Sequence, residues 1–212
     1  MTEKITLLEE SAVSGFLHEP ATASGNGLVL THGAGGNAAA PLLVAIATRF
    51  CEAGWTVLRC NLPFRQKRRF GPPHPSAAPQ DREGLRAAVA LMRSRVTGKT
   101  VLGGHSYGGR QSSILASESP GLADALLLLS YPLHPPAKPE QLRTAHFPAL
   151  RTPTLFVHGT KDPFGSVEEL SAALPLIPAR TDLLIVEGAG HDLARGKFDI
   201  DSLILAPMAT LL

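Results

Sequence analysis

The stretch that decides the fold is Thr100-Val101-Leu102-Gly103-Gly104-His105-Ser106-Tyr107-Gly108-Gly109. An apolar run that favours a β-strand leads into it, and a helical pattern follows until Glu118, where Ser119-Pro120-Gly121 predicts its end. The centre, Gly104 to Gly108, has Gly-x-Ser-x-Gly spacing, which is typical of a sharp strand-to-helix turn that points a serine hydroxyl outward. We therefore predict a strained turn at Ser106. A glycine-rich turn that only lets the helix pack closely is the alternative.

Strand and helix signals alternate outward from this stretch in both directions. Six short apolar runs predict the central strands: Gly27–Thr31, Thr56–Cys60, Thr100–Gly104, Ala125–Leu129, Thr154–His158 and Asp182–Val186. Helical patterns predict Pro41–Ala53, Asp81–Val96, Tyr107–Glu118, Ser166–Leu174 and Asp199–Leu211. The predicted fold class is α/β, with a mostly parallel central sheet flanked by helices. An antiparallel edge hairpin is expected from Lys4–Leu8 and Val13–Leu17.

Two long loops follow predicted strands directly, at Pro63–Pro79 and Tyr131–Pro153. Open α/β folds bind ligands at the carboxyl edge of the sheet, so both loops are expected to wall a pocket there. The first loop contains one locally basic stretch, Arg65-Gln66-Lys67-Arg68-Arg69. The prolines that follow this stretch predict loop rather than helix, in the simplest interpretation a solvated surface loop.

A serine hydroxyl needs a base to accept its proton before it can attack a carbonyl carbon. His191 is the predicted base, because it follows the last strand in Gly188-Ala189-Gly190-His191 and so lies at the carboxyl edge. A histidine on an ordinary surface loop is the alternative. His32 and His158 also lie at strand ends and are expected to make structural hydrogen bonds, and His105 is expected to point away from the substrate.

The base in turn needs a carboxylate that holds its ring in the correct tautomer. Asp162 fits best, because it follows the strand Thr154–His158 and completes the order Ser, Asp, His along the chain. Rivals near His191 are Asp192, Asp182 and Glu187, which lie too close to it in sequence to reach its ring easily. Asp162 would otherwise serve as a turn or helix-capping residue.

Attack on a carbonyl also develops negative charge on its oxygen, which backbone N–H groups can stabilise. The predicted oxyanion-hole donors are Tyr107, directly after the nucleophile, and Ala34, with Gly35 as its alternative. Gly33 and Gly35 on the same loop are expected to contact the substrate. This loop lacks the last glycine of a dinucleotide fingerprint and the Lys-Ser/Thr of a P-loop, so we predict no cofactor. No metal-binding pattern is found, so we predict no catalytic metal either.

Composition and charge indicate one soluble domain over residues 1–212, because 44% of the residues are hydrophobic and 18% are charged. A net charge of +2 is too small to favour nucleic acid, and no apolar run is long enough for a membrane span. The amino-terminal residues do not resemble a secretory signal. Cys51 and Cys60 lack disulfide or zinc spacing and are expected as buried thiols, which predicts a cytoplasmic location.

These residues resemble the α/β-hydrolase superfamily over nearly the full chain, through His32-Gly33, Gly104 to Gly108, His158-Gly159 with Asp162, and Gly190-His191. A narrower resemblance is to a small, lidless subfamily of predicted hydrolases, carried by Asn61–Arg65, Tyr131–Pro136 and His158–Gly165. Eukaryotic relatives of that subfamily include a testis-expressed protein and a chromatin-complex subunit. The resemblance implies an α/β-hydrolase fold without a lid domain and a triad of Ser106, Asp162 and His191.

The predicted function is hydrolysis of carboxylic esters or thioesters through an acyl-enzyme on Ser106. A short connection after Tyr131 leaves an open pocket, which suits a small-molecule acyl ester or thioester. Arg65, together with the other cations of its loop, and His134 are expected to bind an anionic substrate or leaving group. The alternative from another class is a catalytically idle scaffold that binds a partner protein through its proline-rich loops.

Overall fold

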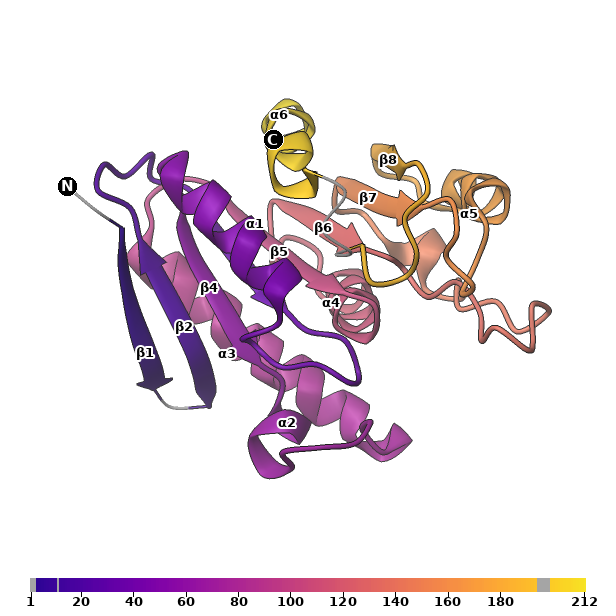
Figure 1. The fold of residues 1–212 in the computed structure, drawn as a ribbon, viewed down its shortest axis with the longest axis horizontal. Coiled ribbons are helices and arrows are strands. Elements are labelled where there is room, and N and C mark those ends of the chain that lie inside the picture. The colour runs from indigo at the N-terminus through magenta and orange to yellow at the C-terminus, as the bar shows by residue number, and fades with distance from the viewer. Residues whose placement is uncertain (1–2, 11, 194–198) are drawn as a thin grey trace.

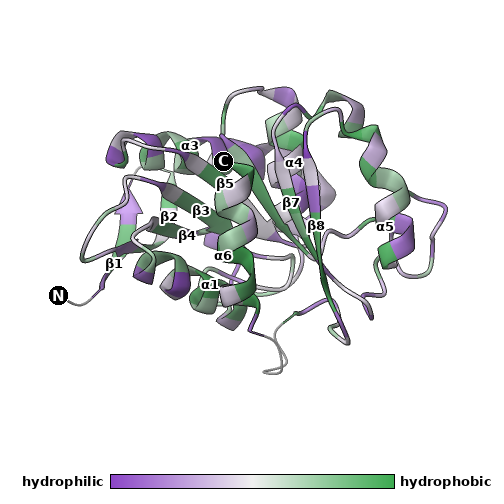
Figure 2. Cartoon of the chain, turned by 90° about the horizontal axis from the view of Figure 1, so that it is seen from above, coloured by the Kyte–Doolittle hydropathy of each residue, from purple (hydrophilic) through white to green (hydrophobic). Residues whose placement is uncertain are grey.

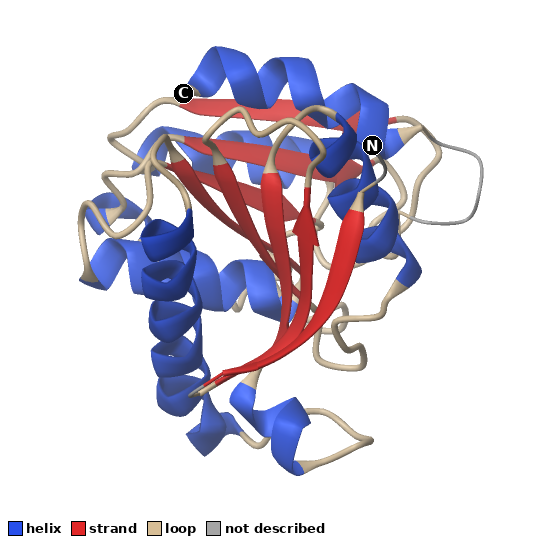
Figure 3. Ribbon diagram, turned by 90° about the vertical axis from the view of Figure 1, so that its left-hand side faces the viewer, coloured by secondary structure: helices blue, strands red, loops and turns tan. Residues whose placement is uncertain are grey.

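The structure is a computed structural model that describes residues 3–10, 12–193 and 199–212. Its centre is a twisted eight-stranded sheet with the strand order β1-β2-β4-β3-β5-β6-β7-β8 (Figures 1 and 3). The strands are β1 (Lys4–Glu10), β2 (Val13–Glu19), β3 (Gly27–Thr31), β4 (Thr56–Asn61), β5 (Thr100–His105), β6 (Ala125–Leu129), β7 (Thr154–Gly159) and β8 (Thr181–Val186). All six central strands expected from the sequence are present, within one residue of the predicted ends.

Strands β3 to β8 are parallel to one another, whereas β1 and β2 run antiparallel at one edge. The predicted hairpin is therefore confirmed, and β2 also pairs with β4. Strand β3 lies between β4 and β5, where Val29 faces Leu58 on one side and Leu102 on the other. All five residues of β3 are buried, as expected for a strand covered on both faces.

Helices cover both faces of the sheet (Figure 1). They are α1 (Pro41–Glu52), α2 (Pro63–Lys67), α3 (Ala78–Arg95), α4 (Tyr107–Glu118), α5 (Val167–Ala173) and α6 (Ile200–Leu211). Side chains alternate along β3, so Leu28 and Leu30 belong to the apolar layer that includes α1 and α6, whereas Val29 belongs to the layer that includes α3 and α4. Figure 2 shows mainly apolar central strands between helices that carry both apolar and polar residues. Two apolar layers, one on each face, thus fix the sheet.

The segment Pro63–Pro79 differs from its prediction as a long loop. It contains α2, a short 3-10 helix at Pro75–Ala77 and the first two residues of α3. Pro63 and Pro75 each occupy the first turn of a helix, where the missing proline N–H costs no hydrogen bond. The prolines predicted loop because the sequence does not show whether a proline ends one helix or begins the next.

Cys51 and Cys60 are free and buried, as predicted. Burial raises the pKa of the Cys51 thiol to about 12, so this side chain stays protonated. Within the described residues, no helix has both the length and the apolar character needed to cross a bilayer.

Candidate active site

The strained turn expected at Ser106 is present between β5 and α4. Ser106 has φ 52° and ψ −116°, a backbone conformation that non-glycine residues rarely adopt. A Cβ atom at Gly108 would lie 2.5 Å from the carbonyl oxygen of His32, so no larger residue fits there without a shift. The Ser106 N–H donates to the carbonyl of Leu129 at 2.8 Å. This bond and the close packing hold the serine at the carboxyl edge of the sheet.

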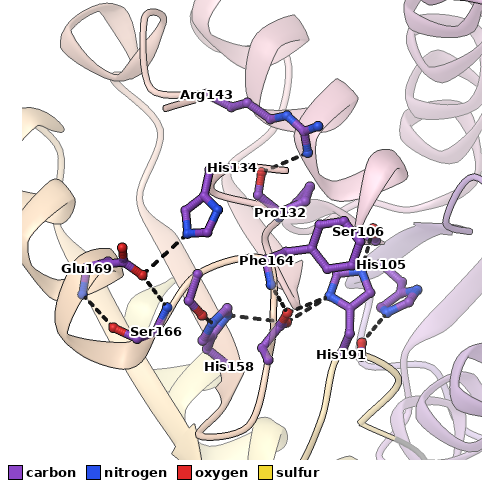
Figure 4. Close-up of polar contacts among 12 residues, drawn as sticks. His105, Ser106, Pro132, His134, Arg143, His158, Phe164, Ser166, Glu169 and His191 are labelled. Carbon is purple, nitrogen blue, oxygen red and sulfur yellow. Dashed lines mark hydrogen bonds and ion pairs between the residues drawn. The ribbon is translucent and has the colours of Figure 1, made fainter. Parts of the chain in front are cut away.

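The structure brings Ser106, His191 and Asp162 into one hydrogen-bonded chain (Figure 4). The distance from Ser106 Oγ to His191 Nε2 is 2.8 Å, and His191 Nδ1 lies 2.8 and 3.0 Å from the two carboxylate oxygens of Asp162. Because an ionised carboxylate only accepts, Nδ1 carries the proton and Nε2 accepts from the serine hydroxyl. The three side chains come from the ends of β5, β8 and β7, which the sheet places together.

Phe164 holds both members of the Asp162–His191 pair. Its N–H donates to Asp162 Oδ1 at 2.9 Å, and its ring lies against the His191 ring with 4.2 Å between centroids. The Asp162 side chain is fully buried. His158 fills the structural position that the sequence predicted, because its Nε2 donates to the carbonyl of Gly165 at 2.8 Å. The turn after β7 therefore orients the carboxylate toward the histidine.

His105 has a position that the sequence interpretation missed. We expected it to point away from the substrate, but it lines the cavity beside Ser106. Its Nε2 donates to the backbone carbonyl of His191 at 2.7 Å, and the two rings lie 5.2 Å apart. Burial lowers the pKa of His105, so the ring is neutral and Nε2 acts as a donor. The residue before the nucleophile therefore anchors the loop that carries His191, a long-range contact that no local pattern signals.

The loop after β3 lies directly against the nucleophile. A Cβ atom at Gly33 would lie 3.0 Å from Nδ1 of His105 and 3.4 Å from the Cβ of Ser106, so the loop passes close to the turn that carries the serine. His32 Nδ1 donates to the carbonyl of Gly33 at 2.8 Å, and Nε2 accepts from the N–H of Leu62 at 3.1 Å. The structural role expected for His32 is thus observed. Ala34, one predicted oxyanion-hole donor, lies on this loop and lines the same cavity as Ser106. Tyr107, the other predicted donor, is the first residue of α4.

A cavity of about 510 Å³ opens beside Ser106. Its wall is largely apolar: besides Gly33, Ala34 and Gly35 it contains Phe164 and, at the start of α1, Ala40, Pro41, Leu42 and Leu43. The expectation that Pro63–Pro79 and Tyr131–Pro153 wall this cavity is wrong, because the described residues around it come from neither segment. The N-terminal end of α1 takes their place.

Arg65 and His134, expected to bind an anionic group, both lie outside this cavity. Arg65 is buried, and its guanidinium donates to backbone carbonyls instead of facing the serine. His134 is buried as well; its Nδ1 donates to the carbonyl of Pro135 at 2.9 Å and its Nε2 lies 3.4 Å from the Glu169 carboxylate (Figure 4). The prediction failed because residue type and loop position do not reveal which way a side chain turns.

A mostly parallel sheet with a serine at the strained turn after its fifth strand defines an α/β-hydrolase fold. The chain belongs to the α/β-hydrolase superfamily: residues 24–202 match the family described as the alpha/beta hydrolase domain.

Solved structures with the same fold share little sequence with this chain. An α/β serine hydrolase homologue from Coxiella burnetii is 18% identical with a TM-score of 0.75, and 98% of each chain is covered. A dienelactone hydrolase from Anabaena variabilis is 19% identical with a TM-score of 0.75, covering 99% of this chain and 96% of that one. An α/β serine hydrolase without a lid from Xanthomonas campestris is 17% identical with a TM-score of 0.72, covering 99% and 95%.

Proposed function

We propose that this protein is a serine hydrolase that cleaves carboxylic esters or thioesters through an acyl-enzyme on Ser106. The observation that carries the proposal is the hydrogen-bonded chain from Ser106 through His191 to Asp162, with the serine at a strained turn beside a cavity. A serine that merely allows close helix packing needs none of these contacts. Membership of the α/β-hydrolase superfamily supports the same chemistry.

The reaction begins when Ser106 Oγ attacks the carbonyl carbon and its proton passes to His191 Nε2. Asp162 stabilises the imidazolium that forms, through the bond it already accepts from Nδ1. The tetrahedral oxyanion is bound by the N–H groups of Ala34 and Tyr107. His191 then gives the proton to the leaving alkoxide or thiolate, and a water activated by the same histidine releases the acid.

The cavity favours an apolar group on the substrate. The residues around it include no arginine or lysine in the described part of the chain, and α1 contributes aliphatic side chains. A neutral ester or thioester with an apolar acyl or alcohol part therefore fits this site better than an anionic one. Arg65 and His134 have contacts elsewhere, so we do not assign them to the substrate.

We also place the protein in the small, lidless hydrolase subfamily and in the cytoplasm. The subfamily assignment depends on the segments around Arg65, Tyr131 and His158, and the proposed location depends on the two buried thiols. Neither assignment affects the chemistry proposed for Ser106.

The decisive experiment is intact-mass analysis after treatment with a fluorophosphonate, which reacts with activated serines. We expect one adduct on the wild type, no adduct on Ser106→Ala and a strongly slowed reaction on His191→Ala. Ser112→Ala is the matched control, because the Ser112 hydroxyl donates to the carbonyl of Gly108 and is fully buried. A folded wild type that forms no adduct would contradict the proposal and favour a catalytically idle scaffold that binds a partner.

A further inference from the structure

Arg65 is a buried cation. Within the described residues, the hydrogen bonds that its guanidinium donates all go to main-chain carbonyl oxygens. It is 7% exposed and lies in the short helix α2. Its Nε donates to the carbonyl of Gly36 at 2.8 Å, and its Nη2 donates to those of Ala34 and Gly71, both at 2.9 Å. Its Nη1 donates to the carbonyl of Arg68 at 3.1 Å. Within the described residues it forms no ion pair, so the guanidinium fork is used to hold backbone.

These bonds fix the direction of peptide groups in the loop after β3. All peptide bonds of the described chain are trans, so each N–H points opposite to the carbonyl of the preceding residue. The carbonyl of Ala34 is held by Arg65, and the carbonyl of Gly33 accepts from the Gly36 N–H at 3.0 Å and from His32. The peptide that carries the Ala34 N–H is therefore held by Gly36 and His32, and the next peptide, which carries the Gly35 N–H, is held by Arg65.

The helix that carries Arg65 is also tied to the second candidate donor. Asp81 on α3 is fully buried, and its two carboxylate oxygens accept from the Phe64 N–H at 3.0 Å and from the Tyr107 hydroxyl at 2.8 Å. The Phe64 ring lies edge-on to the ring of Tyr107, with 5.9 Å between centroids. One short helix thus contacts both the loop of Ala34 and the residue that follows the nucleophile.

We propose that Arg65 is a positioning residue that fixes the loop of the oxyanion hole by holding the carbonyls of Ala34 and Gly36, while Asp81 ties the same helix to Tyr107. The inference rests on the proposed hydrolase function. According to this inference, Arg65, the one buried arginine of the basic stretch Arg65–Arg69, helps to stabilise the transition state without contacting the substrate. Preorganised donors of this kind stabilise charge because they need not reorient during the reaction.

The test compares Arg65→Ala, Arg65→Lys and the matched control Arg69→Ala on a neutral p-nitrophenyl ester. Arg69 is exposed and stacks on Phe70. We expect Arg65→Ala to lower kcat about 30-fold with KM nearly unchanged, because the lost interaction stabilises only the transition state. Arg65→Lys should recover little of the activity, since an ammonium lacks the planar fork. Free guanidinium should restore part of the activity of Arg65→Ala and leave Arg69→Ala unaffected.

The loop has other supports, so these variants are expected to fold. Ala38 is held independently, by Arg59 Nη1 on its carbonyl and by the Asn61 side chain on its N–H at 2.8 Å. If Arg65→Ala does not fold, the tenfold or greater loss of kcat expected for Arg65→Lys decides the question. Unchanged kcat, raised KM alone, or loss of activity that guanidinium cannot restore would overturn the inference. An inactive wild type would instead overturn the proposed function, and this inference with it.

Discussion

Two groups of polar side chains at the carboxyl edge of the sheet have opposite orientations. After β5, β7 and β8, the side chains of Ser106, Asp162 and His191 bond to one another beside the cavity. After β3 and β4, the side chains of His32 and Arg65 hold backbone carbonyls instead of bonding to the reacting residues, and Arg65 lies outside the cavity. The side chains of the first group can take part in a reaction, whereas those of the second group hold the backbone of the loop after β3. Both groups nevertheless contain a histidine and a charged residue. Substitutions in the two groups should therefore have different consequences.

Asp162→Asn should produce the largest change and affect chemistry alone. An amide can accept from Nδ1 only weakly and favours the wrong tautomer of His191, so kcat on a neutral ester should fall about 10⁴-fold. Thermal unfolding should change little, because the amide has nearly the same shape as the carboxylate. Steady-state kinetics and calorimetry on the same preparation check this. A loss of less than tenfold would mean that the first group does not act as a unit.

The first group could be predicted from the sequence because its residues follow strands in a fixed order. Each of Ser106, Asp162 and His191 comes directly after an apolar run, and parallel strands bring such positions to one edge. The strand pattern also gave the sheet, since the six central strands are short, apolar and well separated. Helix α2 was missed because its proline could equally end a helix.

The second group could not be predicted, because its contacts depend on three-dimensional packing. The partners of Arg65 include Ala34 and Gly36, which lie far from it in sequence and accept through backbone oxygen that every residue carries. Nothing in residue type marks such an acceptor. The same reason applies to two other contacts that the sequence did not predict. These are the bond from His105 to the carbonyl of His191 and the bond from Tyr107 to Asp81.

A second prediction tests whether the neutral His32 ring stabilises the folded protein. Burial lowers the pKa of His32 from 6.5 to about 4. The unfolded chain therefore binds more protons than the folded one between these pH values, and stability falls as the pH drops through this window. The loss attributable to His32 is about 3 kcal/mol.

His32→Gln keeps an amide donor and acceptor but cannot titrate, so it should flatten the pH dependence of Tm between pH 6.5 and about 4. Some slope remains, because burial also lowers the pKa of His105 and His146. The exposed His74 offers the matched control, since His74→Gln should leave the profile unchanged. An identical slope in His32→Gln and wild type would show that this ring does not hold the loop in its neutral form.

Ala40→Phe tests the apolar wall of the cavity beside Ser106. Ala40 lines the cavity at the start of α1. Each buried methylene contributes about 0.8 kcal/mol, so wild-type kcat/KM should rise about fourfold per added acyl carbon until the cavity is full. Ala40→Phe should lower kcat/KM for long acyl chains about 30-fold and leave acetate esters within about threefold.

The control for this variant is Ala39→Phe, because Ala39 is exposed and lies outside this cavity. A series of p-nitrophenyl esters of increasing length measures both variants. If chain length has no influence on the wild type, the acyl group does not enter the cavity beside Ser106, and the alcohol part becomes its occupant.

His105 shares a feature with each group. It lies beside the reacting residues, like the first group, and bonds to a backbone carbonyl, like the second. Its Nε2 donates to the carbonyl of His191, which fixes the position of the base rather than its charge. His105→Leu should therefore lower kcat about tenfold, the effect of losing one hydrogen bond to a positioned group. His105→Gln places an amide N–H close to the position of Nε2 and should retain at least a third of the activity, about threefold below wild type at most. Equal losses in both variants would mean that the ring packs against His191 without holding its carbonyl, and His105 would then belong with the apolar wall.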